Sequence, residues 1–400
     1  MNTPSTVIKI FGLGGGGSNA VNRMIDIGLE GVEYIAANTD AQALKLSQAT
    51  TKLQIGPKLT KGLGAGGRWE VGREAALESR NEIRKALDGA DVVFLTCGMG
   101  GGTGTGAISV AAEIARGMGI LTVAIVTTPF SFEASRRRAN SEAGLEALRP
   151  TVDTLIQVSN DKLLGLVGRN VPFETALRVA DEVLRQGVQG LTEMITRPGL
   201  INVDFNNVRA IMQDAGNAMM AIGQGKGENK AADAIHQALH MPLLDLPTLQ
   251  DARGVLLHFT GGDDLSLFEV SQAGEQIRKA APDADIVFGA SMDPAMQGRA
   301  QVILIATGFT QRAPEPRPLP VIAAQPIEPP AETESAPAHE SVAAAKPAPR
   351  VNLAQALFSQ AMSPEPKAES FVAQEVTVNP NNLDIPAFLR RRRSIGDLKG

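Results

Sequence analysis

The segment GMGGGTGTGA, residues 98–107, decides the fold because of its composition and because of what lies on either side of it. Six of its ten residues are glycine; the apolar run DVVFLTC precedes it, and the helix-like run AISVAAEIARG follows from its last residue. A loop that ends a strand and opens a helix presents unpaired backbone N–H groups at the positive end of the helix dipole. Because glycine has no Cβ, that backbone is open to close approach by an anion. The segment therefore predicts a phosphate-binding loop between a buried strand and a helix.

A second glycine-rich segment, GLGGGGSN at 12–19, ends the strand-like run VIKIFGL and precedes a helix expected from Asn19 to Gly28. Further strand-like runs are VEYIAANTD, VVFLTC, ILTVAIVTT and TLIQVSND, mostly separated by helical stretches. This alternation predicts an α/β fold in which helices cover both faces of a parallel sheet. Ligands of such sheets bind at the carboxyl ends of the strands, where both glycine-rich segments lie. We expect the two segments to face one cleft that suits a polyphosphate.

The glycine pattern leaves more than one nucleotide class open. Gly12, Gly14 and Gly17 satisfy the spacing G-x-G-x-x-G after a strand, so a nicotinamide-dependent oxidoreductase is an alternative. That alternative uses one phosphate loop and leaves residues 98–107 unexplained. A Walker P-loop is excluded because neither segment ends in G-K-[ST].

Composition limits the function of this 400-residue chain. Its formal net charge of −5 argues against wholesale coating of nucleic acid, which needs a basic surface, so we expect no nucleic-acid partner. We expect no membrane span, since no apolar run is long enough. The single cysteine, Cys97, excludes an internal disulfide and favours a reducing, cytoplasmic location. His236 and His240 have the spacing of a zinc helix but lack its glutamate, so we expect no metal site.

The composition of the chain changes near residue 310. Apolar residues at helical spacing predict a long, largely buried helix over Glu174–Thr196, which ends near Pro198. After it, the runs RGVLLHFTGG, ADIVFGA and QVILIATGF predict strands that form a small α+β unit with the helical SLFEVSQAGEQIRKAA. From Gln311 onward proline and alanine dominate, which predicts a disordered linker.

An ordered set of motifs resembles the tubulin and FtsZ superfamily of GTPases. These motifs are GGGGSNAV, NTDAQAL, TKGLGAGG, GMGGGTGTGA, TPFSFE, NDKLL, VLRQGVQG, ITRPGLINVDF and LDIPAFL. The resemblance is to the bacterial FtsZ family of polymerising cell-division GTPases rather than to tubulin, which is longer and lacks this tail. It implies a flexible N-terminus (1–6), a Rossmann-like GTP-binding domain (7–172), a long central helix (173–198) and a smaller α+β second domain (199–310). A linker (311–381) and a C-terminal docking peptide (382–400) follow.

The resemblance also implies which residues bind GTP or GDP. They are Gly15, Gly16, Gly17, Ser18, Asn19, Gly101, Gly102, Thr103, Gly104, Thr105, Glu133, Arg137, Asn160 and Asp181. The carboxylate of Asp181 would accept from two guanine N–H donors, which adenine does not present together. Taken alone, Glu133 and Arg137 at i, i+4 spacing fit a surface ion pair equally well. Mg²⁺ is expected with the triphosphate, held mainly by phosphate and water ligands.

Hydrolysis in the family depends on the loop after the central helix, which enters the nucleotide site of the next subunit of a head-to-tail filament. The resemblance assigns catalytic positions to Asn202, Asp204 and Asn207. The family pattern N-x-D-x-x-D has an acid where this chain has Asn207, and a neutral amide is not a base. A GTP-binding scaffold with little hydrolysis is therefore an alternative.

The C-terminal end places apolar residues at helix-like spacing ahead of four arginines. The resemblance implies docking to membrane-tethering and regulatory division proteins, at the inner face of the membrane at the division site. The docking residues are Leu383, Ile385, Pro386, Phe388, Leu389 and Arg390. A solvated tail with chance hydrophobic residues is the alternative.

Overall fold

The computed structural model describes residues 6–164, 173–196, 199–201, 203–241, 243 and 249–309. The N-terminus expected to be flexible lies almost wholly outside this range, as do the expected linker and docking peptide. Asn202 also lies outside it. Among the described residues, no helix combines the length and the apolar character that a membrane crossing requires.

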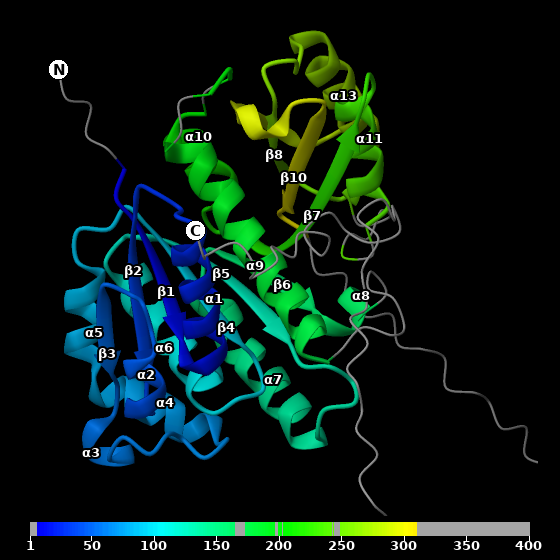
Figure 1. The fold of residues 1–400 in the computed structure, drawn as a ribbon. Coiled ribbons are helices and arrows are strands. Elements are labelled where there is room, and N and C mark those ends of the chain that lie inside the picture. The colour runs from blue at the N-terminus through cyan, green and yellow to red at the C-terminus, as the bar shows by residue number, and fades with distance from the viewer. Residues whose placement is uncertain are drawn as a thin grey trace, which may run out of the picture. The chain divides into compact units, whose positions relative to one another are not determined.

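One ten-stranded sheet runs through the described chain in the order β3-β2-β1-β4-β5-β6-β7-β10-β8-β9 (Figure 1). The strands are β1 (Ile8–Leu13), β2 (Val32–Asn38), β3 (Thr51–Gln54), β4 (Val92–Gly98), β5 (Leu121–Thr128), β6 (Thr154–Ser159), β7 (Gly216–Lys226), β8 (Gly254–Gly261), β9 (Asp285–Met292) and β10 (Arg299–Thr307). Strands from β3 to β7 are parallel, β10 is antiparallel to both of its neighbours, and β8 and β9 are parallel to each other. The parallel sheet predicted for the first part of the chain is confirmed, and the antiparallel strand β10 makes the complete sheet mixed.

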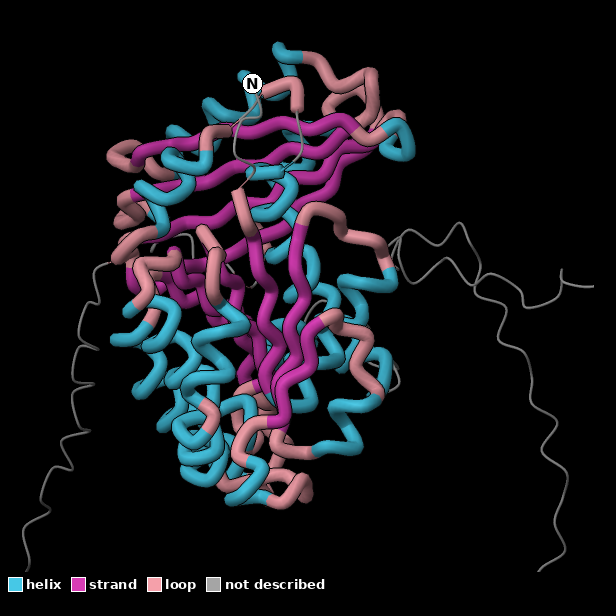
Figure 2. The backbone as a smooth tube through the Cα atoms, turned by 90° about the vertical axis from the view of Figure 1, so that its left-hand side faces the viewer, coloured by secondary structure: helices cyan, strands magenta, loops and turns pink. Residues whose placement is uncertain are grey.

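Helices cover both faces of this N-terminal half (Figure 2). They are α1 (Gly14–Asp26), α2 (Ala41–Lys45), α3 (Pro57–Thr60), α4 (Trp69–Glu78), α5 (Arg80–Leu87), α6 (Thr103–Gly117), α7 (Ser135–Leu148) and α8 (Asn160–Leu164). One core packs α1 and α9 (Phe173–Thr196) against the sheet, and a second core packs α5, α6 and α7 against its other face. Every residue of β1 is buried, as expected for a strand covered on both sides.

The C-terminal half is built on β7, β10, β8 and β9. Its helices include α10 (Phe205–Met212), α11 (Lys230–Leu239) and α13 (Leu267–Ala280). A short 3₁₀ turn at Pro294–Met296 lies between β9 and β10, and another at Arg149–Thr151 follows α7 in the N-terminal half. A third core lies between this part of the sheet and helices α11 and α13. Ser266 caps α13 and forms a capping box with Glu269, which satisfies two free backbone donors at the start of the helix.

The long helix α9 agrees with the predicted stretch Glu174–Thr196, starting one residue earlier. Its buried side chains, such as Leu184 and Val188, share a core with residues from both halves of the sheet, including Ile125 of β5 and Ile303 of β10. A single apolar face of α9 therefore links the two halves.

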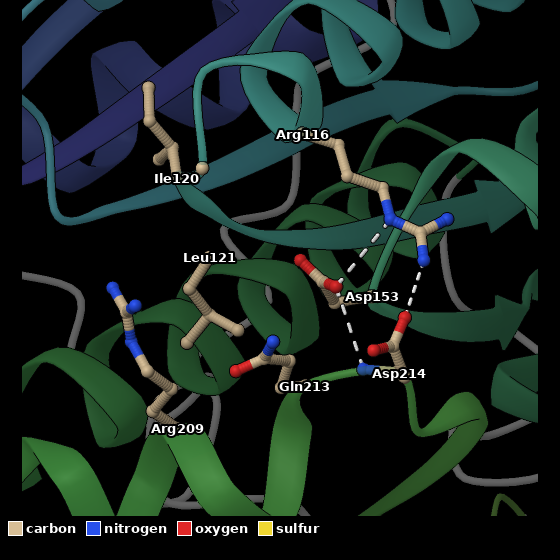
Figure 3. A pocket seen from close by; sticks show the side chains of 8 residues that line it. Arg116, Ile120, Leu121, Asp153, Arg209, Gln213 and Asp214 are labelled. Atoms are coloured by element: carbon tan, nitrogen blue, oxygen red, sulfur yellow. Dashed lines mark hydrogen bonds and ion pairs between the residues drawn. The ribbon is translucent and has the colours of Figure 1, made fainter.

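The two halves of the sheet join through a short ladder, in which only Thr154–Ile156 of β6 pair with Gly216–Ala218 of β7. Beside this ladder a cavity of about 210 Å³ holds Arg116 and two acidic residues (Figure 3). The guanidinium of Arg116 lies 3.7 Å from the Asp153 carboxylate and forms an ion pair with Asp214. Polar contacts thus supplement a short run of backbone pairing.

Candidate nucleotide-binding site

A cavity of about 600 Å³ opens where β1, β4 and β5 end. Both glycine-rich segments line it, which confirms that they face one cleft. The sequence-predicted residues that line it are Gly15, Gly16, Asn19, Gly101, Gly102, Thr103, Gly104, Glu133, Arg137, Asn160 and Asp181. Residues that sequence reasoning missed also line it, among them Arg23, Met99 and Thr127.

The first glycine-rich segment is not a loop ahead of a helix but the first turn of the helix itself. The prediction that this helix begins at Asn19 is wrong, because α1 begins at Gly14. Tight packing requires glycine in this first turn, because a Cβ on Gly17 would lie 2.4 Å from the carbonyl oxygen of Thr96. Only glycine lets the turn sit this close to β4.

Helices α1 and α6 both begin at the cavity, at Gly14 and Thr103. Neither helix has an acidic residue in its first turn, so the positive ends of both dipoles are uncompensated there. Two helix N-termini at one cavity attract an anion with several charges. The hydroxyl oxygens of Thr39 and Thr103 lie 2.6 Å apart at this edge, and hold the start of α6 against the end of β2.

The glycines at the cavity fall into two groups according to the space around them. A Cβ on Gly15 or Gly101 would meet no atom within 4 Å. A Cβ on Gly104 would lie 2.8 Å from the carbonyl oxygen of Leu13, and one on Gly102 would lie 2.8 Å from the Cβ of Ala65. Gly102 and Gly104 therefore line the cavity and also allow close packing of the chain.

Gly17, Ser18 and Thr105 do not line the cavity. Thr105 is buried, and its hydroxyl accepts from the backbone N–H of Gly100 at 2.9 Å, which shapes the loop from inside. Ser18 Oγ and Asn160 Oδ1 are buried and have no hydrogen-bond partner among the described residues. Unpartnered buried polar atoms in and beside an open cradle fit a polar ligand such as a nucleotide.

Glu133 and Arg137 lie at the cavity and form an ion pair with each other. The Glu133 carboxylate also accepts from the backbone N–H of Phe130 at 3.0 Å. Arg137 remains largely exposed, so its guanidinium is free to turn toward an anion. The pair is thus both an i, i+4 ion pair and part of the cavity wall.

Asp181 faces Arg23 across the cavity wall, with 3.0 Å between Oδ2 and Nη1. Burial raises the pKa of Asp181 to about 6, against the lowering effect of the Arg23 charge. Sequence reasoning missed Arg23, although it lies four residues after Asn19 and hence on the same face of α1.

Cys97 is fully buried beside the second glycine-rich segment, with its sulfur 3.4 Å from that of Met99. Burial raises the pKa of this thiol, so the thiolate required for oxidation is disfavoured. Cys97 acts here as a small apolar core residue.

Asp204 and Asn207 do not line the cavity. Asp204 caps α10, where its carboxylate accepts from the backbone N–H of Asn206 at 3.0 Å, and both Asp204 and Asn207 are exposed. The helix between Asp181 and Thr196 alone spans about 22 Å, so α9 separates this loop from Asp181.

Comparisons with known proteins agree with this architecture. Residues 7–168 match the GTPase domain of the Tubulin/FtsZ family, and residues 216–310 match the C-terminal domain of the FtsZ family. The chain is similar to an empty FtsZ dimer from M. jannaschii, with 44% identity and a TM-score of 0.74 over 77% of this chain and 89% of that chain. It shares its fold with the GTPγS-bound protofilament of CetZ2 from Haloferax volcanii, with 20% identity and a TM-score of 0.66 over 76% and 94%.

The match to a GTPase domain decides against the nicotinamide-dependent alternative. Two domain matches in the expected order, together with 44% identity over most of the chain, leave one assignment. The chain belongs to the FtsZ family, the cell-division branch of the tubulin-like GTPases.

Proposed function

We propose that the cavity binds GTP and GDP in one orientation. The glycines and the two helix N-termini would hold the phosphates, Asn160 would contact the ribose, and Asp181 would accept from the N1–H and N2–H groups of guanine. The buried, unpartnered Ser18 Oγ and Asn160 Oδ1 and the open cradle at Gly15 and Gly101 support this placement. Mg²⁺ would neutralise charge on the β and γ phosphates, held mainly by phosphate and water.

We also propose that the chain polymerises head to tail and that one subunit completes the site of the next. The observation that carries this proposal is the separation of Asp204 from the cavity by α9. A residue at that distance cannot reach a nucleotide in its own subunit. An exposed loop at the far end of the subunit can do so when copies stack with the loop over the cavity.

Asp204 is the group in that loop with the chemistry for hydrolysis. Its carboxylate would orient the attacking water and accept charge from it as the bond from oxygen to the γ phosphorus forms and GDP leaves. Asn207 would donate or accept a hydrogen bond but would not take a proton. The second candidate function, a GTP-binding scaffold with slow turnover, rests on this residue.

In the cell, the filament would form the division ring on the inner face of the cytoplasmic membrane. The C-terminal peptide would dock on membrane-tethering and regulatory division proteins, with Phe388 as the apolar anchor and the arginines as a cationic flank. The residues between 311 and 381 would act as the tether.

Light scattering with parallel phosphate release after addition of GTP tests the proposal. We expect both signals to rise together above a threshold protein concentration, and NAD to cause neither. Mixing Gly101→Ser, which blocks the cradle, with Asp204→Asn is the decisive arm. Since the first supplies an intact loop and the second an intact cavity, the mixture should regain part of the phosphate release. A mixture as inactive as its components would overturn the shared site.

A further inference from the structure

Arg23 lines the nucleotide cavity but belongs to neither glycine-rich segment. It lies in the last turn of α1, and one guanidinium nitrogen, Nη1, contacts two groups on α9. It lies 3.0 Å from Asp181 Oδ2 and donates to the carbonyl oxygen of Arg178 at 3.1 Å. Arg23 therefore joins the helix that starts at the phosphate cradle to the helix that carries the guanine-facing carboxylate.

The other charged groups around Asp181 are engaged or remote. Strands β5 and β6, which pack against α9, carry no charged side chain. On α8, Asp161 and Lys162 are exposed, and Asp161 accepts from the backbone N–H of Ser131. His258 on β8 and Asp285 on β9 belong to strands that meet α9 at its far end, where Met194 packs on β9.

Other charged groups lie in the cavity wall and on helices α1 and α9. In the cavity, Glu133 pairs with Arg137. On α9 itself, Glu182 pairs with Arg185, while Arg178 is exposed. Asp26, also on α1, accepts from Gln48. Arg23 is the charge that opposes the effect of burial on the pKa of Asp181.

We propose that Arg23 is the positioning residue that keeps the Asp181 carboxylate ionised and correctly turned for guanine, and so sets the preference for purines that carry a 2-amino group. The inference rests on the proposed role of Asp181. An ionised carboxylate has two acceptor oxygens for the N1–H and N2–H donors, whereas a protonated one retains only part of that capacity. A bound base removes further water from the carboxylate, which makes the opposing cation more important.

The direction of the pH effect follows from the pKa of Asp181. Because this pKa is raised to about 6, the carboxylate is ionised above that pH and protonated below it. The preference for GTP over inosine triphosphate, which lacks the 2-amino group, should therefore be largest well above pH 6 and decline as the pH falls through that region. Removal of the Arg23 charge raises the pKa further, so the decline should begin at a higher pH.

The test measures the affinities of the full chain for GTP and inosine triphosphate across this pH range. The terminal phosphate also titrates near pH 6, but it does so in both nucleotides and cancels in the ratio of the two affinities. We expect Arg23→Met to move the midpoint of this ratio upward by about one pH unit. Arg23→Lys, which retains the charge, should keep the midpoint of the natural chain.

The outcomes separate this inference from the proposed function. Asp181→Asn should abolish both the preference and its pH dependence; a variant that retains the preference would overturn the role of Asp181 itself. If Asp181→Asn abolishes the preference but Arg23→Met leaves the midpoint unchanged, the role of Arg23 alone is wrong. A purely structural role would lower both affinities by the same factor at every pH, which also overturns the inference.

Discussion

The two ends of helix α9 differ in how far their functional groups are fixed within one copy of the chain. At one end, Asp181 is largely buried, paired with Arg23 and part of a cavity. At the other end, Asp204 and Asn207 lie exposed at the start of α10, where the Asp204 carboxylate accepts a hydrogen bond from the backbone N–H of Asn206. Binding groups are thus organised in advance, while the hydrolytic loop becomes useful only when another surface covers it.

The largest expected effect comes from Asp204→Asn, which tests the exposed end. Asparagine also caps helices, so α10 should be preserved while the carboxylate is lost. Phosphate release should fall by about 10²–10⁴-fold, the range for loss of a general acid or base. The Kd for GTP should stay unchanged, because Asp204 does not line the cavity. If GTP affinity fell by the same factor as phosphate release, Asp204 would contribute to nucleotide binding, and the two ends of α9 would not differ in function.

A smaller change in the opposite direction is expected from Asn207→Asp. If the second position of the loop assists as a base, phosphate release should rise by about ten- to a thousandfold. The measurement needs matched polymer mass, so that the rate reports chemistry and not assembly. A rate that stays the same or falls would show that Asn207 positions water adequately, and would remove the reason for the slow-scaffold alternative.

The buried end is tested by a matched pair of glycines. Gly101→Ala places a Cβ in open space within the cradle, so the melting temperature without nucleotide should be unchanged while GTP affinity falls by about ten- to a hundredfold. Gly104→Ala meets the carbonyl oxygen of Leu13 at 2.8 Å and should lower stability itself by about 1–3 kcal/mol. Thermal melts with and without GTP separate the two. Equal melting temperatures of the two nucleotide-free variants would contradict this division of the glycines.

Much of the fold could be predicted from local pattern, and the exceptions have physical causes. Strand β3 was missed because its residues Thr51–Gln54 are largely exposed and polar, which leaves no alternation to detect. Strand β7 was missed because its glycines suggest a loop. A Cβ on Gly223 would lie 1.9 Å from the carbonyl oxygen of Ala234, so this glycine instead allows α11 to lie directly on the strand.

At the site too, local sequence pattern predicts some residues and fails for others. Glycine segments at strand ends identify a phosphate cradle locally, since the chemistry lies in consecutive backbone groups. The partnership of Arg23 with Asp181 joins residues far apart in the chain, and depends on where α1 begins and on how α9 packs against it. The space around each glycine also depends on distant segments, such as Ala65 beside Gly102. Neither feature is visible in sequence spacing alone.

The smallest expected effect concerns the join between the two halves of the sheet, which α9 also spans. Arg116→Met removes the ion pairs with Asp153 and Asp214, and leaves the apolar stem of the side chain in place. Asp153 remains satisfied, because it accepts from the backbone N–H of Thr122 at 2.8 Å. Arg116 and Asp214 are substantially exposed, so the loss in unfolding free energy should be only about 1 kcal/mol.

Arg80→Met is the matched control, since its ion pair with Glu113 is exposed on both sides and joins no separate halves. It should change stability by less than about 0.5 kcal/mol. Neither variant should alter GTP affinity, because neither residue lines the nucleotide cavity. The reason is geometric: three backbone pairs and the buried face of α9 carry the connection between the halves, and the polar contacts only supplement them. A fall in GTP affinity in Arg116→Met alone would mean that this join also controls the cavity, and that the buried end of α9 is not organised independently of the rest of the subunit.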